Sequence, residues 1–333
     1  MTIFVLLGPT AVGKTALSLR LAEYLQAPIL NCDSRQIYCE IPICTAAPTA
    51  SEQARVPHYF VGTHALTDSY SAAQYETDVL RLVESRSAKG NDCHGVEDAF
   101  LLSGGSMMYI DAVVKGIDDM PQADPAIREQ LRALLEAEGL EPLLAQLAQL
   151  DPDYYARVDR KNPMRVVHGL EMCLTTGRPF SSFHTGQPKP RPFRVVQIGL
   201  KRDREELYRR IDQRVDMMFE EGLVEETRRV YEQFQQTVDE QLAGVIRNPG
   251  PTQKQPIPNL LPVSLNTVGL KEMLLHYTGV YSLDQAKERI CHNSRIYSKK
   301  QMTWFQRDQE IKWFSPDDVD EAIKYIESKV QCH

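Results

Sequence analysis

The segment GPTAVGKT at residues 8–15 constrains the fold of this chain more than any other feature of its sequence. The apolar run IFVLL at residues 3–7 precedes it, and after it Leu17, Leu21 and Leu25 recur at helical spacing. A strand, a glycine-rich turn and a helix in this order form the context in which the pattern GxxxxGK(S/T) binds phosphate. The sequence therefore predicts an α/β fold in which a parallel sheet is flanked by helices.

The residue types of this segment suit an anionic ligand. Its glycines allow the backbone amide groups to turn inward around phosphate oxygens, and the N-terminus of the following helix adds partial positive charge. Lys14 would neutralise phosphate charge, and the hydroxyl of Thr15 would bind Mg²⁺. We therefore predict a P-loop NTPase-like core that binds a di- or triphosphate. The candidate ligands are Gly8, Pro9, Thr10, Ala11, Val12, Gly13, Lys14 and Thr15.

A carboxylate follows the second predicted strand, which lies in APILNCD at residues 27–33. Because a crossover helix joins this strand to the first, Asp33 should emerge beside the phosphate loop at the carboxyl edge of the sheet. There it could take a proton from an attacking hydroxyl or amine as a general base. The alternative is that Asp33 only caps the next turn together with Ser34.

A second glycine turn, Gly104-Gly105, follows the predicted strand at residues 100–103 and precedes a helix. The first hydroxyl of that helix, Ser106, should reach the same edge of the sheet and donate to a phosphate or to the bridging oxygen of a leaving group. Capping the helix is the alternative for Ser106. The two roles are compatible, because a capping hydroxyl keeps a spare proton or lone pair.

The sequence changes character after Gly116. Strand-like runs stop, and Asp-Pro and Asn-Pro helix starts appear together with many leucines. The apolar segment VVQIGL at residues 195–200 then resumes the sheet pattern. We therefore predict an all-helical domain at residues 119–192, inserted into a discontinuous core domain of residues 1–118 and 193–333.

The charge of the chain gives two opposing indications about a nucleic-acid partner. The net charge of −7 argues against one. However, residues 189–214 contain nine Lys or Arg against four Asp or Glu, and residues 289–303 contain four basic residues and no acidic one. Such strips suit a polyanion bound at one place, although ordinary solvated helix faces are the alternative.

The seven cysteines and the apolar segments bear on the cellular compartment. The cysteines are scattered and lack CxxC spacing, so the sequence predicts neither a disulfide framework nor a structural zinc. No basic run precedes MTIFVLL, and no window approaches 18 unbroken apolar residues. We expect a cytoplasmic protein that does not span a membrane.

An ordered series of motifs extends over nearly the whole chain: GPTAVGKT, DSRQIY, LLSGGSMMY, VGLKE and RIYSKKQMTWF. This series resembles that of the bacterial tRNA dimethylallyltransferases, also called tRNA isopentenyltransferases. The resemblance implies transfer of a dimethylallyl group from dimethylallyl pyrophosphate to the exocyclic amine of the adenosine just 3′ of the tRNA anticodon. It also implies Mg²⁺, release of pyrophosphate and no consumption of ATP. We expect the chain to act as a monomer.

The resemblance implies roles for individual residues. Asp33 would be the base, Thr15 the metal ligand, and Arg214, by its position, an additional pyrophosphate ligand. The residues implied in catalysis are Lys14, Thr15, Asp33 and Ser106. The residues implied in tRNA contact are Asp33, Ser34, Arg35, Gln36, Ser106, Arg128, Met164, Arg165, Val166, Val167 and His168.

The sequence departs from the usual family pattern at several positions and leaves two other functions open. Cys44 and Ala47 stand where glycine and lysine are usual, and Met164, His168 and Leu270 replace glutamine, arginine and tyrosine. A P-loop kinase of small molecules would use the same loop and the same carboxylate, but it gives no reason for the basic and aromatic helix near the C-terminus. A tRNA-binding homologue whose catalysis has decayed is the other alternative.

Overall fold

The computed structural model describes residues 1–87, 99–246 and 261–330 of the chain. The chain forms two compact units, one of residues 1–114 and 191–333 and one of residues 115–190. We call them the core unit and the helical unit. The borders expected from the sequence, after residues 118 and 192, fall a few residues further along the chain.

Within the described residues, the core unit contains a six-stranded sheet with the order β3-β2-β4-β1-β5-β6. All of its strand pairs are parallel, which confirms the predicted sheet. The strands are β1 (Thr2–Leu7), β2 (Ile29–Cys32), β3 (His58–Tyr59), β4 (Ala99–Gly104), β5 (Arg194–Leu200) and β6 (Lys312–Phe314). Four of them, β1, β2, β4 and β5, are largely or fully buried, as expected for a parallel sheet covered on both faces.

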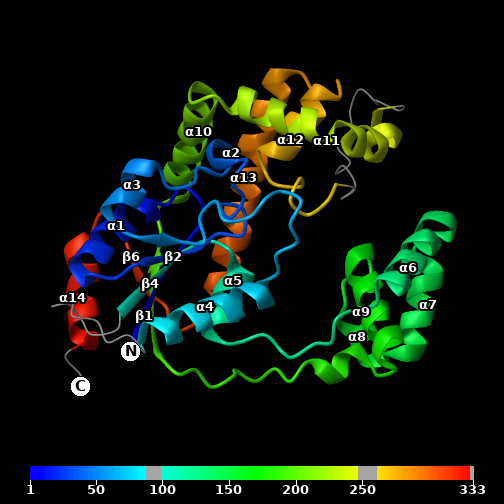
Figure 1. The fold of residues 1–333 in the computed structure, drawn as a ribbon, viewed down its shortest axis with the longest axis horizontal. Helices are drawn as coiled ribbons and strands as arrows, with labels where there is room; N and C mark the ends of the chain where they lie inside the picture. The colour runs from blue at the N-terminus through cyan, green and yellow to red at the C-terminus, as the bar shows by residue number, and fades with distance from the viewer. Residues whose placement is uncertain (88–98, 247–260, 331–333) are drawn as a thin grey trace. The chain divides into compact units, whose positions relative to one another are not determined.

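Helices cover both faces of this sheet (Figure 1). Because side chains alternate along a strand, Phe4 and Leu6 of β1 pack into one apolar cluster, whereas Ile3 and Val5 pack into the other. The first cluster contains residues of α1 (Lys14–Leu25), α10 (Arg204–Glu220) and α14 (Val319–Val330). The second contains residues of α4 (Ala72–Ser87), α5 (Met107–Val114) and α13 (Leu283–Phe305).

A third apolar cluster packs the segment after β2 against further helices. Ile37 and Ile41 lie in it together with residues of α10, α11 (Leu223–Ile246), α12 (Leu270–Tyr277) and α13. The short helices α2 (Pro42–Thr45) and α3 (Ala50–Arg55) follow in the same segment. This packing brings helices from the C-terminal half of the chain beside the segment that begins with Asp33.

The helical unit contains α6 (Pro125–Glu138), α7 (Glu141–Leu150), α8 (Pro152–Arg157), α9 (Pro163–Thr176) and the 3-10 helix η1 (Phe180–Phe183). The expected helix starts are observed, because Asp124, Asp151 and Asn162 each accept a backbone N–H from the first turn that follows. Leu143, Leu147 and other apolar side chains form its own core.

Three expectations from the sequence can be compared with the structure only over the described residues. The five cysteines that the structure describes are free thiols. Among residues 1–87, 99–246 and 261–330, no helix has the length and apolarity to cross a membrane. The proline-rich stretch at residues 249–262, which the sequence predicts to be irregular, lies almost entirely outside the described residues.

Candidate active site

The phosphate loop joins the carboxyl end of β1 to α1. Gly13 has a φ of 115°, a backbone conformation that favours glycine, and it begins the helix. The Nζ of Lys14 donates to the carbonyl oxygens of Gly8 and Pro9 at 2.9 and 2.8 Å, so the ammonium lies within the loop. Burial and the neighbouring positive charge of Arg214 lower the pKa of Lys14 to about 7, and the carboxylate of Asp33 opposes this shift.

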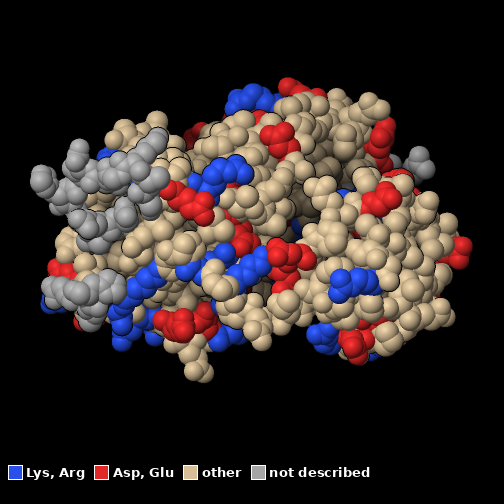
Figure 2. Space-filling view, turned by 60° about the horizontal axis from the view of Figure 1, so that its bottom comes forward, with Lys and Arg blue, Asp and Glu red and all other residues tan. Residues whose placement is uncertain are grey.

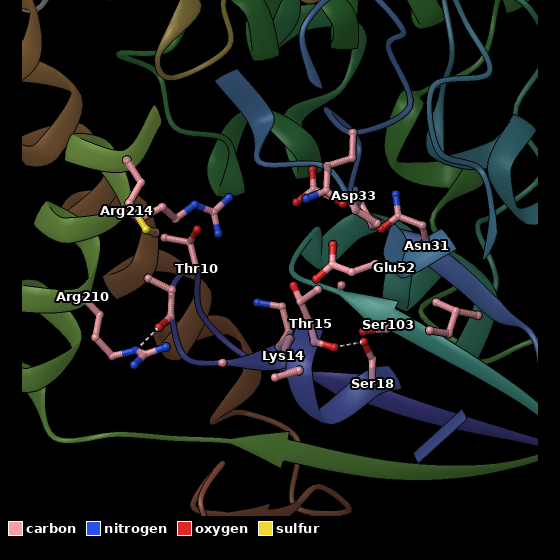
Figure 3. Close-up of a pocket in the computed structure, with 18 of the residues that line it drawn as sticks. Thr10, Lys14, Thr15, Ser18, Asn31, Asp33, Glu52, Ser103, Arg210 and Arg214 are labelled. Atoms are coloured by element: carbon pink, nitrogen blue, oxygen red, sulfur yellow. Dashed lines mark hydrogen bonds between the residues drawn. The ribbon is translucent and has the colours of Figure 1, made fainter. Parts of the chain in front are cut away.

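Two arginines hold the loop, Arg202 from just before α10 and Arg210 from within that helix. Arg202 donates through Nε to the carbonyl oxygen of Val12 at 3.0 Å, and Arg210 donates through Nε to that of Ala11 at 2.9 Å. Figure 3 shows the second of these bonds. The side chain of Val12 is buried in the core of the sheet, so this residue faces a ligand only through its backbone. The loop therefore has a fixed outer edge and presents its inner side to a cavity.

Gln301 of α13 links the phosphate loop to the second glycine turn. Its Oε1 accepts the N–H of Thr10 at 2.9 Å, and its Nε2 donates to the carbonyl oxygen of Gly105 at 2.8 Å. This side chain is 2% exposed, so no water competes for these bonds. A Cβ at Gly104 would lie 2.0 Å from the carbonyl oxygen of Cys32, so β4 and β2 approach too closely there for any residue but glycine.

Asp33 lies directly after β2, where its side chain bonds to a turn and lines a cavity. Its Oδ1 accepts the N–H of Arg35 at 2.9 Å, which forms the turn. The same side chain also points into a cavity above the phosphate loop (Figure 3). Because the turn uses one N–H bond to Oδ1, the carboxylate keeps acceptor capacity toward the cavity.

Ser106 lies behind this turn. Its Oγ accepts the N–H of Ser34 at 2.8 Å and donates to the Oγ of Ser34 at 3.2 Å. Ser106 is 6% exposed and lines neither of the two cavities described below. Ser106 therefore supports the position of the Asp33 turn. The phenol of Tyr297 lies near this turn, and its pKa is raised to about 12, chiefly by burial and then by the charge of Asp33.

Two cavities meet at Asp33. The first, of about 680 Å³, is lined by Gly13, Lys14 and Thr15 of the phosphate loop. The second, of about 410 Å³, is lined by Ser34 and Arg35. The residues that line both cavities are Thr10, Asp33, Arg214 and Tyr297. A carboxylate, a guanidinium and two hydroxyls therefore stand where the two cavities adjoin.

Arg214 reaches this boundary from α10. Its Nη2 donates to the carbonyl oxygen of Thr45 at 3.0 Å. Burial lowers the pKa of Arg214, and the charge of Asp33 opposes that effect. Figure 3 shows Lys14, Arg214 and Asp33 pointing into the same space from α1, α10 and the end of β2. The charged side chains that line this first cavity are Lys14, Arg210, Arg214, Asp33, Glu52 and Asp216.

The residues at the first cavity fit a Mg²⁺ ion held largely by a phosphate ligand. Thr15 lines the cavity and offers a hydroxyl, an oxygen ligand of the kind that Mg²⁺ prefers. In the part of the chain that the structure describes, no group of three or more His, Cys, Asp and Glu side chains is arranged to hold a metal ion. Mg²⁺ ordinarily keeps several waters and uses one or two protein ligands plus substrate phosphates, which agrees with this donor set.

The expected tRNA contacts of the helical unit divide into exposed and buried side chains. Met164, Arg165 and His168 are exposed on α9. The side chains of Val166 and Val167 are 0% and 5% exposed in the core of the unit, which leaves them no surface for tRNA. The expectation for these two valines is therefore corrected to a packing role.

A buried carboxylate brings two of the exposed candidates together. Glu171, which is 2% exposed, accepts from Arg128 Nε at 2.6 Å and lies 3.3 Å from His168 Nδ1. Both partners keep about half of their side chains exposed, at 49% each. Arg128 and His168 are far apart in sequence, so only the fold shows that they share one anchor.

Part of the basic excess in the sequence is neutralised by ion pairs. Arg202 pairs with Glu206 and Asp317, and Arg295 pairs with Asp212. Figure 2 shows Lys and Arg side chains interspersed with Asp and Glu on the face that it draws. The basic strips are thus partly neutralised within the protein, and only the remainder of their charge is open to a polyanion.

Comparison with known proteins relates this site to an enzyme family. The profile of the family described as IPP transferase matches residues 36–308. A tRNA dimethylallyltransferase of Porphyromonas gingivalis is 54% identical over 316 residues, which are 95% of this chain and 94% of that protein. One of Bacteroides fragilis is 50% identical and covers 99% of each chain. The crystal structure of a tRNA isopentenylpyrophosphate transferase from Bacillus halodurans superposes with a TM-score of 0.66 at 28% identity, over 99% of this chain and 97% of that one.

Proposed function

The chain belongs to the IPP transferase family of tRNA dimethylallyltransferases, and from this premise we propose that it prenylates tRNA. The donor is dimethylallyl pyrophosphate. The acceptor is the exocyclic amine of the adenosine on the 3′ side of the anticodon, and pyrophosphate is the second product.

The observation that carries this proposal is the position of Asp33 at the boundary of the two cavities. The phosphate loop lies on one side of this carboxylate, and Ser34 and Arg35 lie on the other. We assign the pyrophosphate to the first cavity and the flipped purine to the second. The prenyl carbon and the attacking nitrogen then meet beside Asp33.

On the donor side, the residues of the chain stabilise a leaving pyrophosphate. As the bond between the allylic carbon and the bridging oxygen breaks, negative charge develops on that oxygen. Amide groups of the loop, the ammonium of Lys14 and the guanidinium of Arg214 are among the donors around the first cavity. A bound pyrophosphate favours the protonated form of Lys14, which the free protein holds only weakly because its pKa is about 7.

On the acceptor side, the carboxylate of Asp33 orients the amine. An adenine amine is a weak nucleophile, so a base that accepts its hydrogen bond favours attack. The new carbon–nitrogen bond forms, the carbon–oxygen bond breaks, and one amine proton passes to Asp33. The adenine must leave its stack to reach this point, as bases generally do when proteins read RNA loops.

Thr15 would help to hold Mg²⁺, which would supply further positive charge for the leaving group. The remaining contacts serve tRNA. Arg128, Arg165 and His168 present polar groups on the surface of the helical unit that suit backbone phosphates. We expect Ser34 and Arg35, which line the second cavity, to contact the base itself. Gln36 lines the first cavity and its amide Nε2 donates to the carbonyl oxygens of Thr45 and Ala46, so we assign it to the support of α2.

Two labelled donors separate this function from its rivals. The purified protein is incubated with unmodified tRNA and Mg²⁺, once with γ-labelled ATP plus candidate small acceptors and once with prenyl-labelled dimethylallyl pyrophosphate. We expect label in tRNA only from the prenyl donor. Phosphate transfer or sustained ATP hydrolysis would support a kinase, whereas tRNA binding without prenyl transfer would support a catalytically decayed homologue.

A further inference from the structure

Glu226 of α11 is a buried carboxylate outside the two cavities. It is 1% exposed. Its Oε2 accepts the N–H of Ile43 at 2.9 Å, and its Oε1 accepts the N–H of Cys44 at 2.7 Å. These donors belong to the first turn of α2, whose first residue, Pro42, has no N–H. Amide groups at a helix start have no partner within the helix, so Glu226 satisfies both of them from another part of the fold.

The other end of α2 receives two side chains that line the first cavity. The carbonyl oxygen of Thr45 accepts from Arg214 Nη2 at 3.0 Å and from Gln36 Nε2 at 3.1 Å. The carbonyl oxygen of Ala46 accepts from the same amide of Gln36 at 3.0 Å. A continuous set of hydrogen bonds therefore runs from Glu226 through α2 to Arg214, where the two cavities adjoin.

We propose that Glu226 is a positioning residue for prenyl transfer: it fixes α2, and the Thr45 carbonyl at the end of α2 fixes the guanidinium of Arg214 against the pyrophosphate. This inference rests on the proposed function, because it assigns Arg214 to that ligand. Glu226 acts only through α2 and Arg214. It touches neither reactant.

Burying the carboxylate of Glu226 carries a desolvation penalty, which indicates that its two directed hydrogen bonds matter. Burial raises the pKa of Glu226, and the two N–H bonds from Cys44 and Ile43 oppose that rise. An apolar side chain of similar volume would fill a buried position without this penalty. Only a group with two acceptor oxygens holds both amide groups at once, which sets the direction of α2 and of its last carbonyls.

Glu226→Gln is the direct perturbation. The amide keeps one acceptor oxygen, but its NH₂ group faces the second backbone donor, so one of the two bonds is lost at nearly constant volume. The matched control is Glu225→Gln, which removes a charge from the exposed neighbouring position. If Glu226→Gln fails to fold, Glu226→Asp keeps the charge and shortens the reach of the carboxylate. Circular dichroism melting establishes that each variant is folded.

The readout is a double-mutant cycle with Arg214→Ala, measured as the Kd for inorganic pyrophosphate with Mg²⁺ and as kcat/KM for dimethylallyl pyrophosphate. We expect Glu226→Gln to weaken pyrophosphate binding roughly tenfold to a hundredfold, the effect of one lost bond to a charged group. On the Arg214→Ala background it should have less than about a twofold effect, since the group that Glu226 positions is absent. Glu225→Gln should match the wild type.

Two results would overturn the inference: equal effects of Glu226→Gln with and without Arg214, or a loss of melting temperature with unchanged pyrophosphate affinity. The binding cycle does not depend on tRNA modification. If the wild type binds pyrophosphate but never prenylates tRNA, the proposed function fails while the cycle still decides whether Glu226 positions Arg214.

Discussion

Replacing Asp33 by asparagine separates the two contacts that this side chain makes. The Oδ1 of Asp33 accepts the N–H of Arg35 at 2.9 Å, and the amide oxygen of asparagine preserves this turn. The variant removes only the charge and the basicity at the boundary of the cavities. We expect turnover to fall by ~10²–10⁴, the usual contribution of a general base, which corresponds to ~2.7–5.4 kcal/mol of activation free energy at ~1.36 kcal/mol per tenfold.

Pyrophosphate binding should change much less than turnover. The charge of Asp33 raises the pKa of Lys14 and of Arg214, so its removal favours the neutral form of Lys14, but it also removes a negative charge beside the bound pyrophosphate. Because these two effects oppose each other, affinity for pyrophosphate is expected to stay nearly constant. Single-turnover prenyl transfer and titration calorimetry with pyrophosphate measure the two effects separately.

Two further variants calibrate this result. Asp308→Asn is the matched control, because Asp308 accepts the N–H of Glu310 at 3.0 Å in the same i to i+2 geometry and lines neither cavity. It should leave turnover unchanged. Asp33→Ala also loses the turn bond, which costs ~0.5–1.5 kcal/mol of unfolding free energy. Unchanged turnover in Asp33→Asn would show that Asp33 serves only the turn. A parallel loss of turnover and pyrophosphate affinity would contradict its assignment as a base that acts on the acceptor amine alone.

Three other perturbations test separate parts of the account. Lys14 has a pKa of about 7 in the free protein and a bound pyrophosphate favours its protonated form, so pyrophosphate affinity should fall by up to ~tenfold per pH unit as pH rises above about 7. Lys14→Arg should show only the titration of the ligand, and identical pH profiles of the two proteins would refute this assignment. Arg165→Ala should raise the tRNA concentration needed for half-maximal rate and reduce the slope of log affinity against log salt by about 1. Val166→Ala should leave that slope unchanged, and because it removes two buried carbon groups it should lower the free energy of unfolding by ~1.6 kcal/mol or more. Ser106→Ala should lower the free energy of unfolding by ~1–3 kcal/mol, measured by urea titration, because it leaves the N–H of Ser34 without its acceptor; an unchanged value would place that N–H against water.

The parts of the site that sequence reasoning located are those fixed by local motifs and by one rule of sheet geometry. The phosphate loop is a continuous segment, so its spacing specifies its backbone. Asp33 follows a strand that a crossover helix places beside the loop, so the carboxyl edge of the sheet brings them together. The same reasoning predicted the edge position of Ser106. It did not predict the direction of the hydroxyl, which depends on the turn at Ser34.

The residues that the sequence did not predict form hydrogen bonds with partners that lie far away along the chain. Gln301 bonds to Thr10 across 291 positions, and Glu226 bonds to Ile43 across 183. No local pattern encodes such pairs, because the packing of α11 and α13 against the segment after β2 creates them. The prediction that Val166 contacts tRNA overlooked a local pattern. Val166 and Leu170 lie four residues apart on α9, and this spacing already marked Val166 as part of the apolar face.

The most direct test of the central claim is mass spectrometry of the nucleosides of unmodified tRNA after reaction with the purified protein and dimethylallyl pyrophosphate. We expect an adenosine in which a dimethylallyl group replaces one amine hydrogen, at the position 3′ of the anticodon. The Asp33→Asn protein should form this nucleoside ~10²–10⁴ times more slowly. Unmodified adenosine after prolonged reaction of the wild type, or equal yields from the two proteins, would contradict the central claim.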